Sequence, residues 1–154
     1  MTKLHPISLR RARKTDLRTQ FAALCYRVVN DKVQVLLITS RRGGRWIIPK
    51  GWPMHGKAPE DAALQEAWEE AGVKGKVTGP CMGLYSYRKG LNKKTNLPCV
   101  AMIYPVKVKS ISNKFPEAGS RRRKWMTPKK AAAKIREPEL AGILRRFDPR
   151  RLHG

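Results

Sequence analysis

Glu66, Glu69 and Glu70 stand at the i, i+3 and i+4 spacing that places side chains in one stripe of a helix. The chain has only 11 Asp and Glu against 34 Lys and Arg, yet five of those acids fall between residues 60 and 70. Like charges at this spacing destabilise a helix by about 0.2–0.5 kcal/mol per pair. A hard divalent cation, Mg²⁺ or alternatively Mn²⁺, would turn that repulsion into a binding site. The other interpretation is a solvated acidic helix face.

The segments that flank the stripe favour the metal site. Gly72 follows the acidic segment, where a glycine commonly ends a helix. Before the stripe, the apolar residues 46–48 lead into a loop rich in Gly and Pro at residues 49–56. A strand, a glycine-containing loop and an acidic helix can together wrap a metal-bound phosphate.

Residues 51–73 resemble the Nudix box, the signature of hydrolases that cleave a diphosphate linked to a second group. The positions that agree with the family pattern are Gly51, Glu66, Glu69, Glu70, Gly72 and Val73. The positions that depart from it are Lys57 in place of the first Glu, Gln65 in place of the Arg, and Ala67 in place of a larger apolar residue.

The departures leave two interpretations open. In the family, the missing Glu and Arg lie near each other, and the Arg helps to hold the catalytic carboxylates. Their joint loss, with Lys57 keeping a cation in the region, would be a compensated change in an active enzyme. The alternative is a weakened or inactive enzyme. The stripe keeps all three carboxylates, which favours activity.

The resemblance also implies which residues carry the chemistry. The metal ligands would be the carboxylates of Glu66, Glu69 and Glu70, with the carbonyl of Gly51 as a further ligand. A carboxylate must accept the proton of the attacking water. Glu66 or Glu69 can do this, and Glu117 is a candidate from outside the box.

Within the family, the chain is most similar to the diphosphoinositol polyphosphate and diadenosine polyphosphate hydrolases. The similarity rests on residues 39–41, 46–51, 69–75 and 121–126. It implies contacts to phosphate groups, for which the candidates are Arg18, Ser40, Arg41, Lys50, Arg88 and Arg123. Any one of these side chains could equally be plain surface.

The net charge of +23 agrees with an anionic ligand. Basic residues cluster in segments around the box, at 41–45, 50–57, 88–94 and 121–124. If these segments converge on one cleft, they would concentrate anions there. We therefore expect a polyanionic, phosphate-containing small molecule as substrate, such as a diadenosine polyphosphate or a diphosphoinositol polyphosphate, cleaved at a phosphoanhydride bond.

Two other functions also fit the basicity. One is a pyrophosphohydrolase acting on the 5′ end of RNA, against which the sequence shows no recognisable platform of exposed aromatic residues. The other is a catalytically weakened Nudix-fold protein that binds nucleic acid. Such a binder would gain nothing from a stripe of carboxylates.

Length and composition predict one domain, because 154 residues are enough to bury a core. We expect a basic arm over residues 1–17, a single Nudix hydrolase domain over 18–148 and a tail over 149–154. We expect no membrane span and no secretory signal. Cys25, Cys81 and Cys99 lack metal spacing and favour free thiols in a reducing cytoplasm.

The order of the predicted elements defines the fold class. We expect a hairpin over residues 20–29 and 33–39, a short strand at 46–48, a helix over 59–71, strands at 76–87, 98–108 and 122–126, and helices from 127 and over 138–147. Residues 88–94 are expected to form a loop. Together with the resemblance, this order predicts an α/β protein, a Nudix-like α/β/α sandwich with a mixed β-sheet.

Overall fold

The computed structural model describes residues 18–90 and 96–152, so the predicted arm at 1–17 lies outside the described residues. The strands are β1 (Arg18–Val29), β2 (Lys32–Thr39), β3 (Trp46–Ile47), β4 (Lys50–Gly51), β5 (Val73–Val77), β6 (Gly83–Gly90), β7 (Asn96–Ile111) and β8 (Arg123–Met126). The helices are α2 (Pro59–Ala71), α3 (Pro128–Lys134), α4 (Pro138–Arg145) and a 3-10 turn at Pro149–Arg151.

Strands β1 and β7 form the centre of a mixed eight-stranded sheet. They are parallel to each other, with Arg18 opposite Cys99 and Tyr26 opposite Lys107. The other pairs are antiparallel: β1 with β2 and β4, β2 with β3 and β8, and β7 with β5 and β6. The centre of the sheet is therefore the only parallel pair among the described strands.

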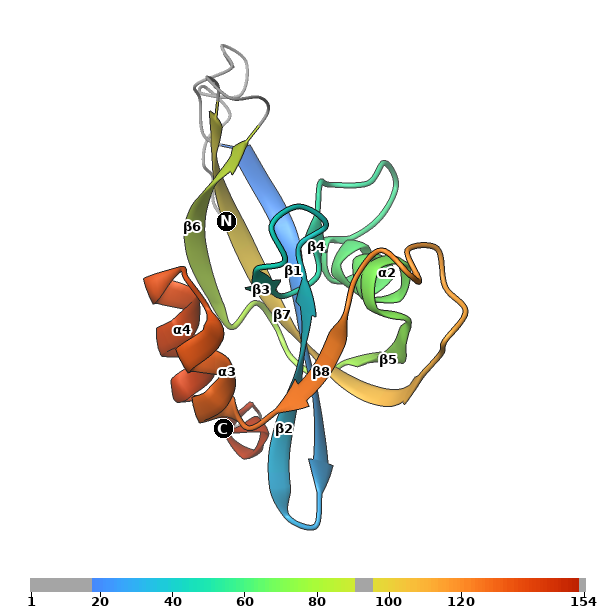
Figure 1. Cartoon of the computed structure of the whole chain (residues 1–154), viewed down its shortest axis with the longest axis vertical. Helices are drawn as coiled ribbons and strands as arrows, with labels where there is room; N and C mark the ends of the chain where they lie inside the picture. Colours follow the sequence, from blue (N-terminus) through green and yellow to red (C-terminus); the bar gives the residue numbers. More distant parts are fainter. Residues whose placement is uncertain (1–17, 91–95, 153–154) are drawn as a thin grey trace.

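Two hydrophobic cores lie on opposite faces of this sheet. Because successive residues of a strand point to opposite faces, Ala23 and Cys25 of β1 pack in the core with α2, whereas Ala22 and Leu24 pack in the core with α3 and α4. Figure 1 shows α2 on one side of the sheet and α3 and α4 on the other. The predicted α/β/α sandwich with a mixed sheet is confirmed.

Helix α2 spans the predicted residues and ends as predicted at Gly72. Gly72 has a left-handed φ of 68°, and its N–H donates to the carbonyl oxygens of Ala67 and Trp68. A Cβ at this position would lie 2.6 Å from the side chain of Phe115 and from the Ser112 carbonyl oxygen, so glycine is required. Buried alanines on the sheet-facing side let the helix approach the strands closely.

The predicted hairpin is also confirmed, with Asn30 and Asp31 at positive φ in its turn. The single strand expected over residues 76–87 is wrong. The structure has β5 and β6 in its place, both paired antiparallel to β7, with residues 78–82 leaving the sheet between them. Pro80 lies within this interruption and Pro105 of β7 lies beside it, and both lack the backbone N–H needed to extend the ladder.

Three smaller differences concern element ends. Arg88 and Lys89, expected in a loop, continue β6. Helix α4 ends at Arg145, two residues before the predicted end, and Phe147 enters the core beyond it. Part of the predicted tail forms the 3-10 turn, after which Leu152 packs on the same core. No helix in residues 18–90 and 96–152 has the length and apolar character needed to cross a membrane.

Candidate active site

The three glutamates of α2 divide between two environments. Glu70 is buried, and one of its carboxylate oxygens accepts a hydrogen bond from the Lys50 backbone N–H of β4 at 3.4 Å. Glu66 lies against the backbone of Gly51, where an added Cβ would overlap the Glu66 carboxylate. Glu69 instead accepts a hydrogen bond from the side-chain amide of Gln65 at 2.7 Å. The structure thus brings Glu66 and Glu70 together against β4.

Burial and mutual repulsion govern the ionisation of this pair. Burial, then hydrogen bonding to Glu70 and the charges of the neighbouring glutamates, raises the pKa of Glu66 to about 8. Burial also raises the pKa of Glu70, while the hydrogen bond from Glu66 and the charges of Arg121 and Lys50 oppose that rise. Two carboxylates held together away from water disfavour each other's charge. Added positive charge would therefore be strongly favourable here.

The residues present fit a hard divalent cation, although they are not arranged as a finished site. No group of three or more His, Cys, Asp or Glu side chains within the described ranges is placed to hold a metal ion. Glu66 and Glu70 offer adjacent carboxylate oxygens, the donors that Mg²⁺ and Mn²⁺ prefer. Glu69 could join them only by leaving the Gln65 amide.

The cation paired with Glu70 is Arg121, which the sequence does not predict as a site residue. Its side chain is 8% exposed, with Nη2 3.7 Å from a Glu70 oxygen and Nε 2.8 Å from a Glu117 oxygen. Its Nη1 donates to the Thr39 carbonyl oxygen at 3.1 Å. No sequence signal separates Arg121 from the basic run at 121–124, which was interpreted only as part of a phosphate-binding surface.

Glu117, the candidate proton acceptor from outside the box, lies beside Arg121 and the C-terminal end of α2. Its backbone N–H donates to the Glu69 carbonyl oxygen at 3.0 Å, which joins the loop before β8 to the end of α2. The exposed guanidinium of Arg41 lies 4.0 Å from its carboxylate. Arg41 is therefore a candidate phosphate contact whose side chain lies beside one of these acids.

Two other predicted phosphate contacts have defined surroundings. The Ser40 hydroxyl donates to the Arg42 carbonyl oxygen and accepts from the Arg45 N–H, so it shapes the turn that carries Arg41. The Lys50 ammonium lies 4.8 Å from the centre of the Tyr87 ring. Burial lowers the pKa of Lys50 to about 8, against the opposing charges of Glu70 and Glu137.

The remaining three candidates differ from one another. Arg88 is exposed on β6, and Arg18 is half-buried at the start of β1. Arg123 donates to the carbonyl oxygens of Ala71 and Ser112 at 2.9 and 2.7 Å and to the Asn113 side chain at 2.9 Å. These bonds close the C-terminal end of α2, and this geometry does not support the predicted phosphate contact of Arg123.

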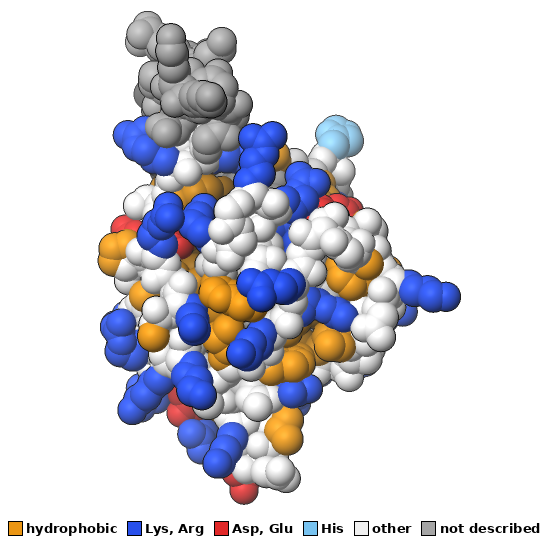
Figure 2. All heavy atoms as spheres, viewed as in Figure 1, with side chains coloured by type: hydrophobic (Ala, Val, Ile, Leu, Met, Phe, Trp, Pro, Cys, Tyr) orange, Lys and Arg blue, Asp and Glu red, His pale blue; other side chains and the backbone are white. Residues whose placement is uncertain are grey.

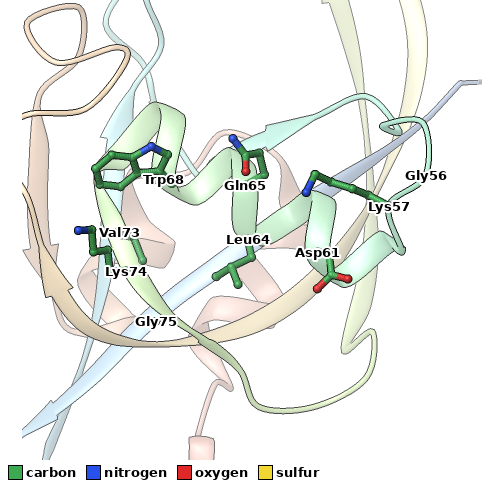
Figure 3. Close-up of a pocket in the computed structure, with 9 residues that line it drawn as sticks. All are labelled: Gly56, Lys57, Asp61, Leu64, Gln65, Trp68, Val73, Lys74 and Gly75. Carbon is green, nitrogen blue, oxygen red and sulfur yellow. The ribbon is translucent and has the colours of Figure 1, made fainter.

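Two of the altered box positions, Lys57 in the loop before α2 and Gln65 on α2, lie beside a pocket that the stripe does not line. Lys57 and Gln65 line an open pocket of about 540 Å³, together with Asp61, Trp68 and residues of β5. Figure 3 shows this pocket, and none of the three stripe glutamates lines it. The cation paired with the buried Glu70 is therefore Arg121 rather than Lys57.

Comparison with known proteins gives the family. A model of the NUDIX domain matches residues 18–147, and the chain belongs to this family. It is 34% identical over 115 residues to the mitochondrial Nudix hydrolase 16 of Arabidopsis thaliana, covering 73% of this chain and 63% of that protein. It is 28% identical over 127 residues to the human diphosphoinositol polyphosphate phosphohydrolase NUDT4B, covering 81% of this chain and 66% of that protein.

Solved structures agree on the fold. The Ap4A hydrolase of C. elegans has a TM-score of 0.60 at 18% identity, with 84% of this chain and 95% of that chain covered. The dihydroneopterin triphosphate pyrophosphohydrolase of E. coli has a TM-score of 0.61 at 16% identity, with 84% and 93% covered. The chain spans only about two thirds or less of the length of the curated relatives named above.

We predict that Gly51→Ala displaces the Glu66 carboxylate and strongly reduces metal binding, because the new Cβ would occupy the space of that carboxylate. Titration with Mn²⁺, followed by the paramagnetic signal of the free ion, measures the effect. Gly79→Ala is the matched control, since its Cβ would make only ordinary contacts of 3.5 Å or more. Unchanged Mn²⁺ affinity in Gly51→Ala would contradict the placement of Glu66.

We predict that Glu66→Gln stabilises the metal-free protein, and increasingly so as the pH rises from 4.5 to about 8. The folded wild type binds the Glu66 proton more tightly than the unfolded chain, so its stability falls across this window. Glutamine has no such proton to lose. Melting temperatures in EDTA, with Glu60→Gln as a control on the exposed part of α2, test this. A pH-independent difference would contradict it.

Proposed function

We propose that this protein is a pyrophosphohydrolase that uses Mg²⁺ or Mn²⁺ to cleave a phosphoanhydride bond in a polyanionic small molecule. The observation that carries the proposal is the pair of carboxylates of half-buried Glu66 and buried Glu70, held together beside Gly51 in a Nudix domain. A structural role alone would not favour this arrangement, because the pair destabilises the metal-free fold.

Each residue of the cluster has a chemical role in this proposal. Glu66, Glu69, Glu70 and the Gly51 carbonyl would hold the cation. When bound, the cation would supply positive charge that neutralises the diphosphate and activates a water. Glu66 or Glu69 would accept the proton of that water. Glu117 is the alternative base, since its loop is bound to α2.

The basic side chains support a substrate with several phosphate groups. Arg41 is 64% exposed and lies beside Glu117. The ammonium of Lys50 has no hydrogen bond or ion pair to another described residue and faces the Tyr87 ring. A relative of this chain is named as a diphosphoinositol polyphosphate phosphohydrolase, and a neighbour in fold as an Ap4A hydrolase. Diphosphoinositol and diadenosine polyphosphates are accordingly the proposed substrate class.

The positive charge outside this site is more dispersed than the sequence suggests. Figure 2 shows Lys and Arg side chains spread over one face, with apolar side chains between them. Trp52, 38% exposed and next to Gly51, could stack on a base of a dinucleotide or of an RNA 5′ end. Triphosphorylated RNA therefore remains the second candidate substrate.

The free thiols of Cys25, Cys81 and Cys99 support a reducing compartment such as the cytoplasm.

A substrate panel tests the proposed function. We expect phosphate release in Mg²⁺ from diphosphoinositol or diadenosine polyphosphates, and loss of most activity in Glu70→Gln without loss of fold. Glu60→Gln on the same helix is the control and should retain activity, because Glu60 is exposed at the start of α2. Preference for triphosphorylated RNA would select the second candidate, and full turnover by Glu70→Gln would reject the metal site.

We predict different effects for Arg41→Ala and Arg123→Ala, although the sequence predicts a phosphate contact for both arginines. Arg41→Ala should raise the KM, more for substrates with more phosphates, and this difference should shrink with added salt, which screens exposed charges over about 8 Å at physiological ionic strength. Arg123→Ala should instead lower the free energy of unfolding by about 1–3 kcal/mol, because it breaks charge-assisted hydrogen bonds at the end of α2.

Arg150→Ala is the control for both measurements, because Arg150 is exposed and pairs only locally with Asp148. It should change neither the salt dependence of the KM nor, beyond a small effect, the stability. If all three variants behave alike toward polyphosphates and nucleotide sugars, the arginine at position 41 has no special part in substrate binding.

A further inference from the structure

Arg121 is distinguished from the other cations by its partner. Within residues 18–90 and 96–152, it is the only Lys or Arg with an ion pair to any of the three glutamates of the stripe. It reaches Glu70 at 3.7 Å from a segment far from the box in sequence. Both side chains of the pair are more than 90% buried, so solvent screens their interaction little.

The guanidinium of Arg121 is fixed by the chain around it. Its three nitrogens are directed to Glu70, Glu117 and the Thr39 carbonyl oxygen. The neighbouring backbone is bound to the end of β2, where the Thr39 N–H donates to the Arg122 carbonyl oxygen and the Arg122 N–H donates to the Thr39 hydroxyl. A planar group held at all its nitrogens can set the orientation of the carboxylates it contacts.

The carboxylates that Arg121 joins come from two separate parts of the chain. Glu70 belongs to α2, whereas Glu117 belongs to the loop before β8. Without a cation between them, these two acids would repel each other in a region of low polarity. Arg121 offsets that repulsion and so allows the Glu117 loop to remain against α2.

Gln65 cannot provide this function from within the helix. Its neutral amide contacts Glu69 at 2.7 Å, and it has no described hydrogen bond to Glu66 or Glu70. An arginine at position 65 would carry a positive charge from the same helix to the edge of the stripe. The chain therefore lacks a cation on α2 beside the stripe and has one that arrives from residue 121.

We propose that Arg121 is a positioning residue that holds the Glu70 and Glu117 carboxylates in their working orientation, in place of a cation at position 65. The inference rests on the hydrolase function proposed above. Arg121 makes no contact with substrate in this proposal. It acts through the two carboxylates.

The first test compares Arg121→Ala, Arg121→Lys and the double variant Arg121→Ala/Gln65→Arg. We expect Arg121→Ala to lower kcat by about 10–100-fold with little change in KM, as losses of residues that orient metal ligands do. Arg121→Lys should recover part of kcat, and so should Gln65→Arg in the Arg121→Ala background. Lys124→Ala is the matched control, because Lys124 is exposed in the same basic run. It should behave as wild type.

Three results would overturn the proposal. They are a kcat of Arg121→Ala close to that of wild type, an Arg121→Lys variant no better than Arg121→Ala, and no recovery by Gln65→Arg. If Arg121→Ala does not fold, Arg121→Lys is combined with Glu117→Gln. Removal of Glu117 should then shrink the effect of Arg121→Lys on kcat, and strictly additive effects would count against the proposal.

Hydrogen exchange at the Glu117 amide separates this inference from the proposed function. That N–H is bound to the Glu69 carbonyl oxygen, and it should exchange faster in Arg121→Ala than in wild type or Lys124→Ala. Faster exchange in a protein that hydrolyses no member of the panel would reject the enzymatic proposal but keep Arg121 as the residue that holds the loop. Unchanged exchange in an active enzyme would reject the inference about Arg121 alone.

Discussion

The site depends on the close approach of two carboxylates of like charge that are partly removed from water, half-buried Glu66 and buried Glu70. Glu66 and Glu70 are one helical turn apart, and α2 presses both against the backbone of β4. This contact is possible only because the sheet-facing side of α2 is made of alanines and because position 51 has no side chain. The repulsion that results makes the site unfavourable when empty and attractive to a small, highly charged cation.

Strand β4 would let both faces of the sheet contribute to the proposed substrate site. It has only two residues, and they point in opposite directions: Gly51 meets Glu66 on the α2 side, whereas the Lys50 ammonium lies over Tyr87 on the side of α3 and α4. A phosphate chain passing the end of this short strand could meet the acidic cluster on one side and a cation on the other. In the proposed function, the shortness of β4 would allow contacts to one substrate from both sides of the sheet.

Local pattern predicted most of the fold. The i, i+3, i+4 glutamates and Gly72 predicted the position of α2, and the turn at Asn30 and Asp31 predicted the hairpin. Both predictions succeeded because each signal lies within one local segment of the chain. The break between β5 and β6 was missed because no charged residue interrupts positions 77–87, and both strands pair with the same strand, β7. Strand β4 was missed because two residues carry no periodicity. Its existence depends on pairing with β1.

The roles of the arginines were the hardest part of the site to predict, because they depend on the face of the sheet to which each side chain points. The run at 121–124 looks like one basic patch in sequence, yet β8 pairs Arg123 with Ile38 and Lys124 with Leu37, which belong to opposite cores. Arg121 and Arg123 accordingly bind α2, Arg121 at the Glu70 carboxylate and Arg123 at the Ala71 carbonyl oxygen, while Arg122 lies over Trp46. Half of the run thus supports α2 from within, and only the rest is surface charge.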